Sequence, residues 1–309
     1  MRIEPIQTEH DRLAISFSGG RTSAMMTRLL MIGRREGQEY VVTFANTGYE
    51  HPSTLDFVHE CDTRWQLGVV WIEAEVDPAH GVGVRHRVVD YASASRDGRP
   101  FADYVRKYGL PGPAAPQCTS RMKLEPMQSY IRRGLGWRAG AYATAVGIRA
   151  DEIDRVSARA MESGVVYPLA DAGVTKAIVG AFMRAQGFDL SLPGDHYGNC
   201  VGCWKKSNRK LYTIAQDDER WFDIARMLER EGAGVKPHEA HPRTMYRGHR
   251  TVSDILSAAR GMHPADRYAD SGQMDLWDEL LDLSGGCGES CDVYADETDE
   301  QRALAQGGE

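Results

Sequence analysis

A short apolar segment at residues 13–17 runs into the sequence Ser16-Phe-Ser-Gly-Gly-Arg-Thr-Ser23, and apolar residues then recur with helical spacing as far as residue 32. This pattern predicts a strand, a glycine turn and a helix. Two further strands are predicted at 40–44 and 67–72, with a helix at 53–65 between them. Strands that alternate with helices predict an α/β fold with a doubly wound, mostly parallel sheet.

The alternating pattern weakens between residues 78 and 116, where glycine, proline and scattered charges surround one predicted helix at 101–107. We interpret residues 78–116 as an insertion or a lid. Further elements are predicted along the rest of the chain: helices at 124–133, 175–186, 221–231 and 252–260, and a strand at 142–148. We therefore assign residues 1–215 to the main domain and residues 216–309 to a helical C-terminal region with a flexible acidic tail.

Composition narrows the environment of the chain. The 309 residues carry a formal net charge of −7, which argues against extensive coating of a nucleic acid but leaves room for a local basic groove. No apolar run approaches the roughly 20 residues that span a bilayer, and the N-terminus lacks the apolar core of a signal peptide. We expect a cytoplasmic protein without a membrane partner.

The glycine turn is suited to an anion. Its glycines let backbone N–H groups converge without obstruction by Cβ atoms, and the helix that follows directs its positive dipole end at the turn. Hydroxyl groups come from Ser16, Ser18, Thr22 and Ser23, and Arg21 adds a charge. The loop therefore predicts a phosphate or pyrophosphate site formed by Ser16, Ser18, Gly19, Gly20, Arg21, Thr22 and Ser23. It is not a Walker A loop, because no Gly-Lys-Ser/Thr follows; the simpler alternative is a strand-to-helix turn with a serine N-cap.

Ser18-Gly-Gly-Arg-Thr-Ser23 resembles the SGGxxS loop of the PP-loop superfamily, which includes ATP pyrophosphatases and the PAPS and APS reductases. Further segments resemble the reductase branch in the same order along residues 13 to 215. These are Asn46-Thr-Gly48 with Pro52 and Thr54, Cys118-Thr-Ser-Arg-Met-Lys123 with Pro126, Gly147-Ile-Arg149 with Asp151, Glu152 and Arg155, Tyr167-Pro-Leu169, and Cys200-x-x-Cys203. Proteins of phages and prophages that are described as PAPS reductase-like have a similar layout, with a single cysteine in the first position.

The resemblance implies a PP-loop (adenine nucleotide alpha hydrolase-like) fold and an adenine nucleotide as ligand: PAPS or APS, or ATP with Mg²⁺. It extends the nucleotide site to Asn46, Thr47, Gly48, Gly147 and Arg155, and it assigns Arg149 and Lys123 to the reacting sulfate or phosphate. Guanidinium groups suit that role because they donate two parallel hydrogen bonds to a tetrahedral anion. The alternative for the two arginines is an ion pair with Asp151, Glu152 or Asp154.

Three cysteines form the predicted metal site. In the cluster-containing branch of the family, two adjacent cysteines and a CxxC pair hold a [4Fe–4S] cluster; here Gln117 precedes the single Cys118, which leaves Cys118, Cys200 and Cys203. Thiolates suit iron–sulfur clusters or zinc. A fourth ligand could come from Cys61, Cys287, Cys291 or His196, or one iron could stay open as in related tRNA thiolation enzymes. The alternative is a zinc site or a pair of reduced thiols.

The sequence Gly286-Cys-Gly-Glu-Ser-Cys291 resembles the terminal ECGxH of the reductases, whose cysteine attacks the sulfur of the sulfonucleotide. The resemblance makes Cys287 the catalytic nucleophile. The expected histidine is missing, and Cys291 stands nearby instead, as a resolving thiol, a metal ligand or an exposed side chain.

Three functions remain open. The first is reduction of an adenylyl sulfate with electrons from a thioredoxin-like donor, and the second is ATP-dependent thiolation of a nucleic acid, with a cysteine desulfurase as the sulfur source. The basic run Trp204-Lys-Lys-Ser-Asn-Arg-Lys210 could contact such a polyanion, although a solvated helix start is the favoured interpretation. The third is a regulator that binds nucleotide without chemistry. We favour reduction; a homodimer is compatible with each function.

Overall fold

The computed structural model describes residues 4–112, 115–156, 163–235 and 243–268. Its six strands form one sheet of order β4-β3-β2-β1-β5-β6. The strands are β1 (Arg12–Ser16), β2 (Glu39–Asn46), β3 (Val69–Val76), β4 (Val84–Val89), β5 (Ala143–Ala145) and β6 (Val165–Val166). All neighbours are parallel except β3 and β4. The predicted α/β fold with a mostly parallel sheet is therefore confirmed.

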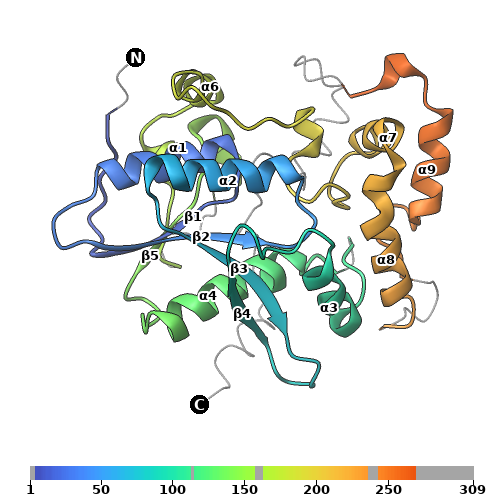
Figure 1. Cartoon of the computed structure of the whole chain (residues 1–309), viewed down its shortest axis with the longest axis horizontal. Coiled ribbons are helices and arrows are strands. Elements are labelled where there is room, and N and C mark those ends of the chain that lie inside the picture. The colour runs from blue at the N-terminus through green and yellow to red at the C-terminus, as the bar shows by residue number, and fades with distance from the viewer. Residues whose placement is uncertain (1–3, 113–114, 157–162, 236–242, 269–309) are drawn as a thin grey trace.

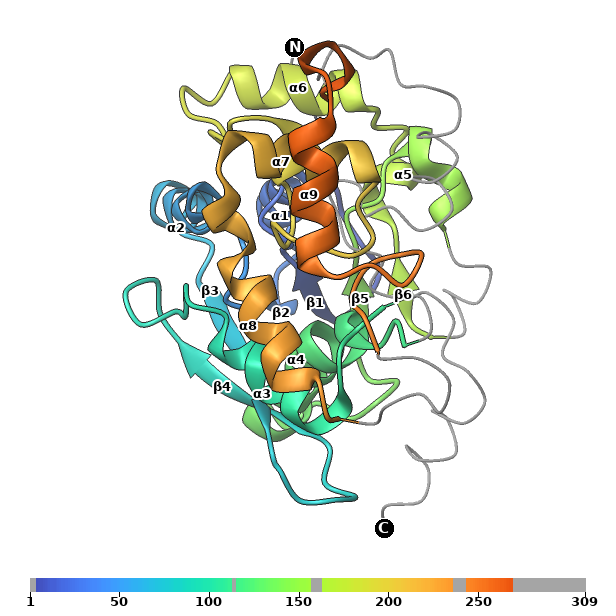
Figure 2. The same ribbon diagram turned by 90° about the vertical axis from the view of Figure 1, so that its right-hand side faces the viewer.

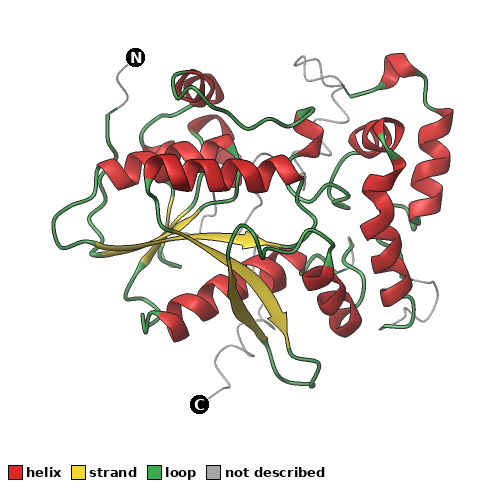
Figure 3. Cartoon of the chain, viewed as in Figure 1, coloured by secondary structure: helices red, strands yellow, loops and turns green. Residues whose placement is uncertain are grey.

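Helices lie on both faces of this sheet, as Figures 1 and 3 show. They are α1 (Arg21–Ile32), α2 (Pro52–Trp65), α3 (Arg99–Tyr108), α4 (Glu125–Ser129), α5 (Pro168–Asp171), α6 (Lys176–Arg184), α7 (Asn208–Asp217), α8 (Asp223–Gly232) and α9 (Val252–Gly261). Short 3₁₀ helices cover Ala150–Arg155, Asp195–Tyr197, Glu219–Phe222 and Pro264–Asp266. Helices α1, α2 and α6 cover one face, and α3 and α4 cover the other.

The central strand is buried on both sides because both faces of the sheet are covered. Leu13, Ala14 and Ile15 are each at most 2% exposed. A parallel strand between two helical layers needs a continuous apolar run, which is the signal that the sequence carries at residues 13–17. Helices α1 and α2 begin within one residue of their predicted starts at 22 and 53.

The helix predicted at 124–133 contains α4 between two π-helical turns, Ser120–Leu124 and Tyr130–Gly134. Pro126 lies inside it and lacks the N–H that a regular α-helix would need there. Such π-turns are frequent at functional sites.

The segment 78–116, interpreted as an insertion or a lid, contributes a strand that its sequence pattern does not predict. Strand β4 pairs antiparallel with β3 and forms one edge of the sheet. The strand signal is weak because an edge strand has little to bury: of its six residues only Val84 is buried, and Arg85 and Arg87 alternate with His86. A lid role for the rest of this segment stays a prediction.

Helices α7, α8 and α9 stand together beside the sheet in Figure 1, and in Figure 2 they face the viewer. Val105 of α3, Leu228 of α8 and Ile255 of α9 belong to one hydrophobic cluster and are fully buried. Helices α8 and α9 of the C-terminal region thus share a hydrophobic core with α3. The domain boundary at residue 215 stays a prediction. Within the described ranges, no helix combines the length and the apolar character needed to cross a bilayer.

Candidate functional site

The order of the strands places a crevice at the carboxyl end of β1. Within the sheet, β2 is the neighbour of β1 on one side, and β5 is its neighbour on the other side. In open α/β sheets, ligands bind outside the carboxyl ends of the strands where the order reverses. The loop after β1 carries Ser18, Gly19 and Gly20, and the segment after β5 carries Gly147 and Arg149.

Gly19 is required by the shape of the loop. Its φ of 84° lies in the left-handed region, and a Cβ atom there would lie 2.7 Å from Thr54 Cγ2 and 3.1 Å from Phe44 Cε2. Gly20 is the N-cap of α1 and provides no side-chain hydrogen bond to it. No N-cap side chain therefore accepts hydrogen bonds from the first N–H groups of α1. An anion could accept them instead, at the positive end of the helix dipole.

Ser18 and Ser23 hold the loop in shape. Ser23 Oγ accepts a hydrogen bond from Ser18 N at 3.1 Å, lies 2.9 Å from Ser18 Oγ, and donates to Gly20 O at 3.0 Å. Ser23 and Thr22 are each 1% exposed, and Ser16 is 7% exposed. These three predicted site residues do not line the cavity in front of the loop, whereas Ser18 does.

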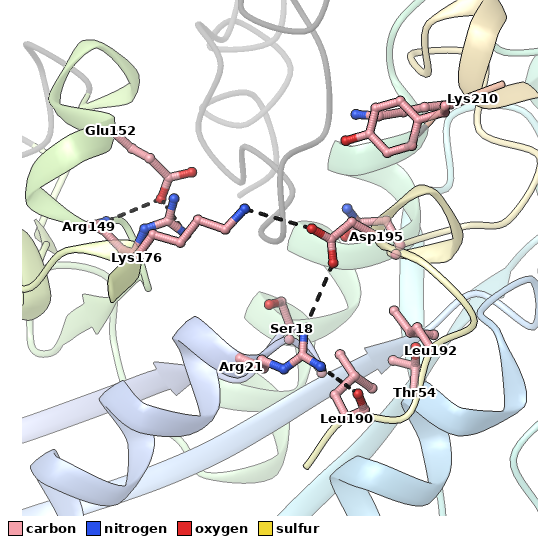
Figure 4. A pocket seen from close by; sticks show the side chains of 15 residues that line it. Ser18, Arg21, Thr54, Arg149, Glu152, Lys176, Leu190, Leu192, Asp195 and Lys210 are labelled. Carbon is pink, nitrogen blue, oxygen red and sulfur yellow. Dashed lines mark hydrogen bonds and ion pairs between the residues drawn. The ribbon is translucent and has the colours of Figure 1, made fainter. Parts of the chain in front are cut away.

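A cavity of about 160 Å³ opens in front of the loop (Figure 4). It is lined by Ser18, Gly19, Gly20, Arg21, Thr54, Arg149, Glu152, Lys176, Leu190, Leu192, Asp195, Gly198, Asn199, Lys210 and Tyr268. We call it the loop cavity. Four of these side chains are cationic and two are carboxylates, so the lining favours an anionic ligand.

Arg21 and Lys176 face a carboxylate across the loop cavity. Arg21 donates to Asp189 and to the carbonyl of Leu190, both at 2.7 Å, and lies 4.0 Å from Asp195. Lys176 lies 3.7 Å from the same Asp195 (Figure 4). The two cations thereby hold the 189–195 segment beside the loop.

Arg149 is the most enclosed cation of the loop cavity, at 7% exposed. Its guanidinium donates to Thr22 Oγ1 at 3.2 Å and to Asp151 at 3.0 Å, and it lies 3.5 Å from Glu152. Burial raises the pKa of Asp151, but the hydrogen bond and charge of Arg149 outweigh it, so that this pKa lies below its ordinary value. Arg155 is 2.5 Å from Glu152 and does not line the loop cavity.

Gly147 lets the end of β5 approach α1. A Cβ atom at this position would lie 3.1 Å from Ser23 Cα and 3.3 Å from Ser23 N. The glycine thus allows Arg149 to reach the beginning of α1, which is a structural reason for the Gly-x-Arg spacing.

The Asn46-Thr-Gly48 segment lies outside the loop cavity. Asn46 is fully buried and donates to Glu73 Oε1 at 2.8 Å and to Ser95 O at 2.9 Å. Gly48 has a φ of 78°, and a Cβ there would lie 3.1 Å from Gly98 N. Both residues have clear structural roles, and their assignment to the nucleotide stays a prediction.

A second cavity contains the predicted metal ligands. It is lined by Thr47, Phe101, Cys118, Thr119, Met122, Lys123, Cys200, Cys203, Trp204, Lys205 and Met245. We call it the cysteine cavity. Cys118, from the segment before α4, thus lines the same cavity as the CxxC pair. That the three cysteines hold a metal stays a prediction.

Lys123 belongs to the cysteine cavity and not to the loop cavity. Its Nζ lies 3.9 Å from Oε1 of Glu50, whose side chain is 2% exposed. A buried carboxylate beside the cysteines was not predicted, since no motif marks Glu50 apart from its position four residues after Asn46.

The other proposed ligands differ in their placement. Cys61 is fully buried in α2 within the main hydrophobic core, and burial raises the pKa of its thiol. His196 is buried beside Tyr197 and lies 3.5 Å from Asp217. Cys287 and Cys291 lie outside the described residues. In the described ranges, no three His, Cys, Asp or Glu side chains converge closely enough to hold a single ion.

The two cavities meet at one peptide. Asn199, whose φ is 58°, lines the loop cavity, and the next residue, Cys200, lines the cysteine cavity. A left-handed residue turns the chain sharply, and asparagine tolerates that conformation better than most residues. The loop cavity and the cysteine cavity are therefore neighbours.

The model of the phosphoadenosine phosphosulfate reductase domain matches residues 12–164. A nin region protein of Escherichia phage lambda is 31% identical over 296 residues, which cover 92% of this chain and 96% of that protein. The chain belongs to the PAPS reductase-like family. A second relative, an uncharacterized protein of Methanocaldococcus jannaschii, is 26% identical over 118 residues, which cover 38% of this chain and 22% of that protein.

Membership in the PAPS reductase-like family confirms the predicted resemblance, and the phage relative agrees with the phage-type layout. The family match includes the loop, Cys118, Lys123 and Arg149, whereas the CxxC pair lies beyond residue 164. Nearly the whole chain, however, aligns with the phage protein.

The basic run that follows the CxxC pair in this family member is partly used inside the fold. Lys206 is 5% exposed and donates to the carbonyls of His196 and Gly198, at 2.5 and 2.8 Å. Arg209 donates to the carbonyls of Asp266 and Arg267. These two cations brace the backbone, which leaves fewer side chains of the run for a polyanion.

Several residues of the loop cavity were not predicted as site residues. Lys176 and Asp195 stand in segments without a motif, and Tyr268 contacts Lys210, whose Nζ lies 5.0 Å from its ring centroid. Only Lys210 carried a signal, since it ends the basic run. The others reach the cavity through tertiary packing.

Proposed function

We propose that the protein is a sulfonucleotide reductase, which transfers the sulfo group of PAPS or APS to a cysteine and releases it as sulfite. The observation that supports this most is the junction of the two cavities at Asn199 and Cys200. A sulfonucleotide joins a phosphate to a sulfate through one oxygen, so its reacting sulfur lies next to the phosphate that the loop binds.

The loop cavity supplies the binding groups for such a substrate. The N-terminus of α1 and the hydroxyl of Ser18 favour the phosphate, and Arg149 offers a guanidinium already oriented by Thr22 and Asp151. Because these contacts already fix the guanidinium, the side chain loses less conformational entropy when the anion binds. Lys176 and Lys210 add charge at the rim.

The chemistry requires a thiolate and a dithiol. Cys287 attacks the sulfur, an S–S bond forms, and the bond from sulfur to the bridging oxygen breaks, leaving its electron pair on the nucleotide phosphate. A thiol of a thioredoxin-like protein then attacks Cys287 Sγ, sulfite leaves with the S–S electron pair, and the second thiol of the donor frees Cys287. The dithiol is oxidised to a disulfide, and sulfur gains two electrons.

The thiol side chains of the cysteine cavity suit the [4Fe–4S] cluster that the family implies. It presents three thiol side chains, and it is lined by Trp204, whose buried indole N–H has no hydrogen-bond acceptor among the described residues. Buried polar groups of this kind normally have a partner, and N–H donors to cluster sulfur are common. Cys118, Cys200 and Cys203 would hold the cluster, which when bound supplies iron and inorganic sulfide at the wall of the nucleotide site.

Zinc fits the same residues less well. A structural zinc ion needs four donors within about 2.3 Å of one point, and no three candidate side chains of the described ranges converge on one ion.

Sulfite release tests the proposal. Anaerobically reconstituted protein is incubated with PAPS or APS and reduced thioredoxin, and sulfite is measured for wild type, Cys287→Ser and Cys291→Ser. We expect release by wild type and Cys291→Ser and its loss in Cys287→Ser. A parallel incubation with ATP, Mg²⁺ and nucleic acid measures pyrophosphate. Pyrophosphate without sulfite would identify the protein as an ATP-dependent sulfurtransferase, and nucleotide binding with neither product would identify a regulator.

A further inference from the structure

Glu50 is a buried carboxylate at the edge of the cysteine cavity, and the reaction proposed above does not use it. Its side chain is 2% exposed. Carboxylates are seldom buried to this extent unless they are paired, hydrogen-bonded or bound to a metal.

The two oxygens of Glu50 face different surroundings. Oε2 accepts hydrogen bonds from the backbone N–H groups of Thr47, at 2.9 Å, and Tyr49, at 3.2 Å. Oε1 lies 3.9 Å from Cys200 Sγ and 3.9 Å from Lys123 Nζ, with Thr47 Oγ1 at 2.8 Å. The backbone therefore fixes one oxygen, and the other is directed at a cysteine and a lysine of the cavity.

The backbone also fixes the distance between Glu50 and Cys200. The two residues form an antiparallel bridge, and Val201 N donates to Tyr49 O at 2.9 Å. Gly202 is packed so tightly against Tyr49 that a Cβ atom there would lie 2.0 Å from Tyr49 Oη. Main-chain contacts thus hold the backbone of Glu50 beside the CxxC pair, and the hydrogen bonds from Thr47 and Tyr49 hold its carboxylate.

Glu50 Oε1 lies close enough to a cavity cysteine to share a metal with it. Cys200 Sγ is 3.9 Å away, and Lys123 and Lys205 line the same cavity. Carboxylate oxygen is an accepted ligand of both iron and zinc.

We propose that Glu50 supplies an oxygen ligand to the metal centre held by Cys118, Cys200 and Cys203. The inference rests on the proposed function for the presence of that centre. It completes a set of four protein ligands with residues of the described chain alone, in place of Cys61, which is enclosed in the hydrophobic core.

Metal content and electron paramagnetic resonance test the inference without activity. Wild type, Glu50→Gln, Glu50→Cys and the control Glu125→Gln are reconstituted anaerobically, and iron, sulfide and zinc are measured per chain. Glu125 is paired with Arg121, 2.8 Å away, and does not line the cysteine cavity. Because an iron without a protein ligand is lost first on mild oxidation, we expect Glu50→Gln to convert from about four to about three iron atoms per chain while wild type and Glu125→Gln keep four.

Glu50→Cys separates ligation from a structural role. A thiolate can replace the carboxylate as ligand but cannot accept the Thr47 and Tyr49 hydrogen bonds in the same way, so recovery of the four-iron signal in this variant supports ligation. Circular dichroism and thermal unfolding of each variant show whether it is folded. A folded Glu50→Gln with an unchanged signal and iron content overturns the proposal.

The outcome for wild type distinguishes this inference from the proposed function. Wild type that binds zinc and no iron contradicts the proposed cluster; in that case at least tenfold weaker zinc binding by Glu50→Gln still supports ligation, and unchanged zinc affinity overturns it. Wild type that binds neither metal overturns both. Sulfite release with an intact cluster in Glu50→Gln overturns the ligand role and leaves the reductase proposal standing.

Discussion

The guanidinium of Arg149 donates a hydrogen bond to Thr22 Oγ1 at 3.2 Å, across 127 residues of sequence. This contact ties the segment after β5 to the first turn of α1, the two elements that flank the crevice at the end of β1. The cation is thereby held at the N-terminus of α1, where we propose that the loop binds an anion.

Replacing Arg149 should therefore weaken anion binding more than replacing Arg155. We expect Arg149→Met to lower the affinity for adenosine 3′,5′-bisphosphate by about tenfold to a hundredfold, because charge-assisted hydrogen bonds contribute about 1.5–3 kcal/mol. Arg155 contacts Glu152 but does not itself line the loop cavity, so Arg155→Met should change this affinity by less than about threefold. Isothermal titration calorimetry measures both, and equal losses would contradict the placement of Arg149 in the site.

Gly19→Ala should disrupt the loop, and Gly37→Ala is its matched control. Both glycines have positive φ, 84° and 77°, but a Cβ at Gly37 meets nothing within 4 Å, whereas at Gly19 it meets Thr54 at 2.7 Å. Backbone strain is common to both, so the steric contact should make Gly19→Ala less stable by a further 1–3 kcal/mol or so. Urea unfolding measures the difference; equal stabilities would show that the loop relaxes freely.

His51 should make stability depend on pH. Its Nδ1 accepts a hydrogen bond from Ser53 N at 3.1 Å as the N-cap of α2, and burial lowers its pKa from the ordinary value of 6.5. Because the folded state binds the proton less readily than the unfolded state, stability should fall as the pH drops below about 6.5. Protonation would also remove the Nδ1 acceptor of the cap.

His51→Asn keeps a capping acceptor but does not titrate. We expect it to reduce the loss of unfolding free energy between pH 7 and pH 5.5 by up to about 1 kcal/mol. Chemical denaturation at both pH values measures this, and an unchanged loss would assign the acid sensitivity to other groups.

Lys206 should be structural, in contrast to its neighbour Lys205. Lys206→Met removes the donor to two backbone carbonyls of the 196–198 segment and should cost about 1–3 kcal/mol of stability. Lys205→Met should cost less than about 0.5 kcal/mol. Thermal unfolding separates the two. If Lys205→Met weakens the binding of single-stranded nucleic acid while stability is unchanged, that result would instead favour the polyanion interpretation of the basic run.

Local features could be predicted because their signals are local. The strand, glycine turn and helix around Ser18 depend on apolar periodicity and on the freedom of Gly19, and both are visible in a window of twenty residues. Strand β4 carried no such signal because its solvent-facing edge position requires little apolar surface. The three cysteines were assembled only through the ordered family resemblance, since nothing in the spacing of Cys118 links it to Cys200.

Which side chains gather at each cavity was decided by the tertiary structure. Asn46 follows the second strand as the resemblance requires, yet its amide is directed at Glu73 and Ser95 in the interior. Glu50 is positioned by its β-bridge to Cys200, 150 residues later in the sequence. Lys206 is buried and bound to backbone carbonyls, although its position in a basic run predicts a solvated side chain. The sequence by itself determined the central strands and the glycine turn, because these depend on backbone propensity and residue type. The packing of distant segments decided which charged groups surround the turn and the cysteines, because long-range contacts leave no mark in the local pattern.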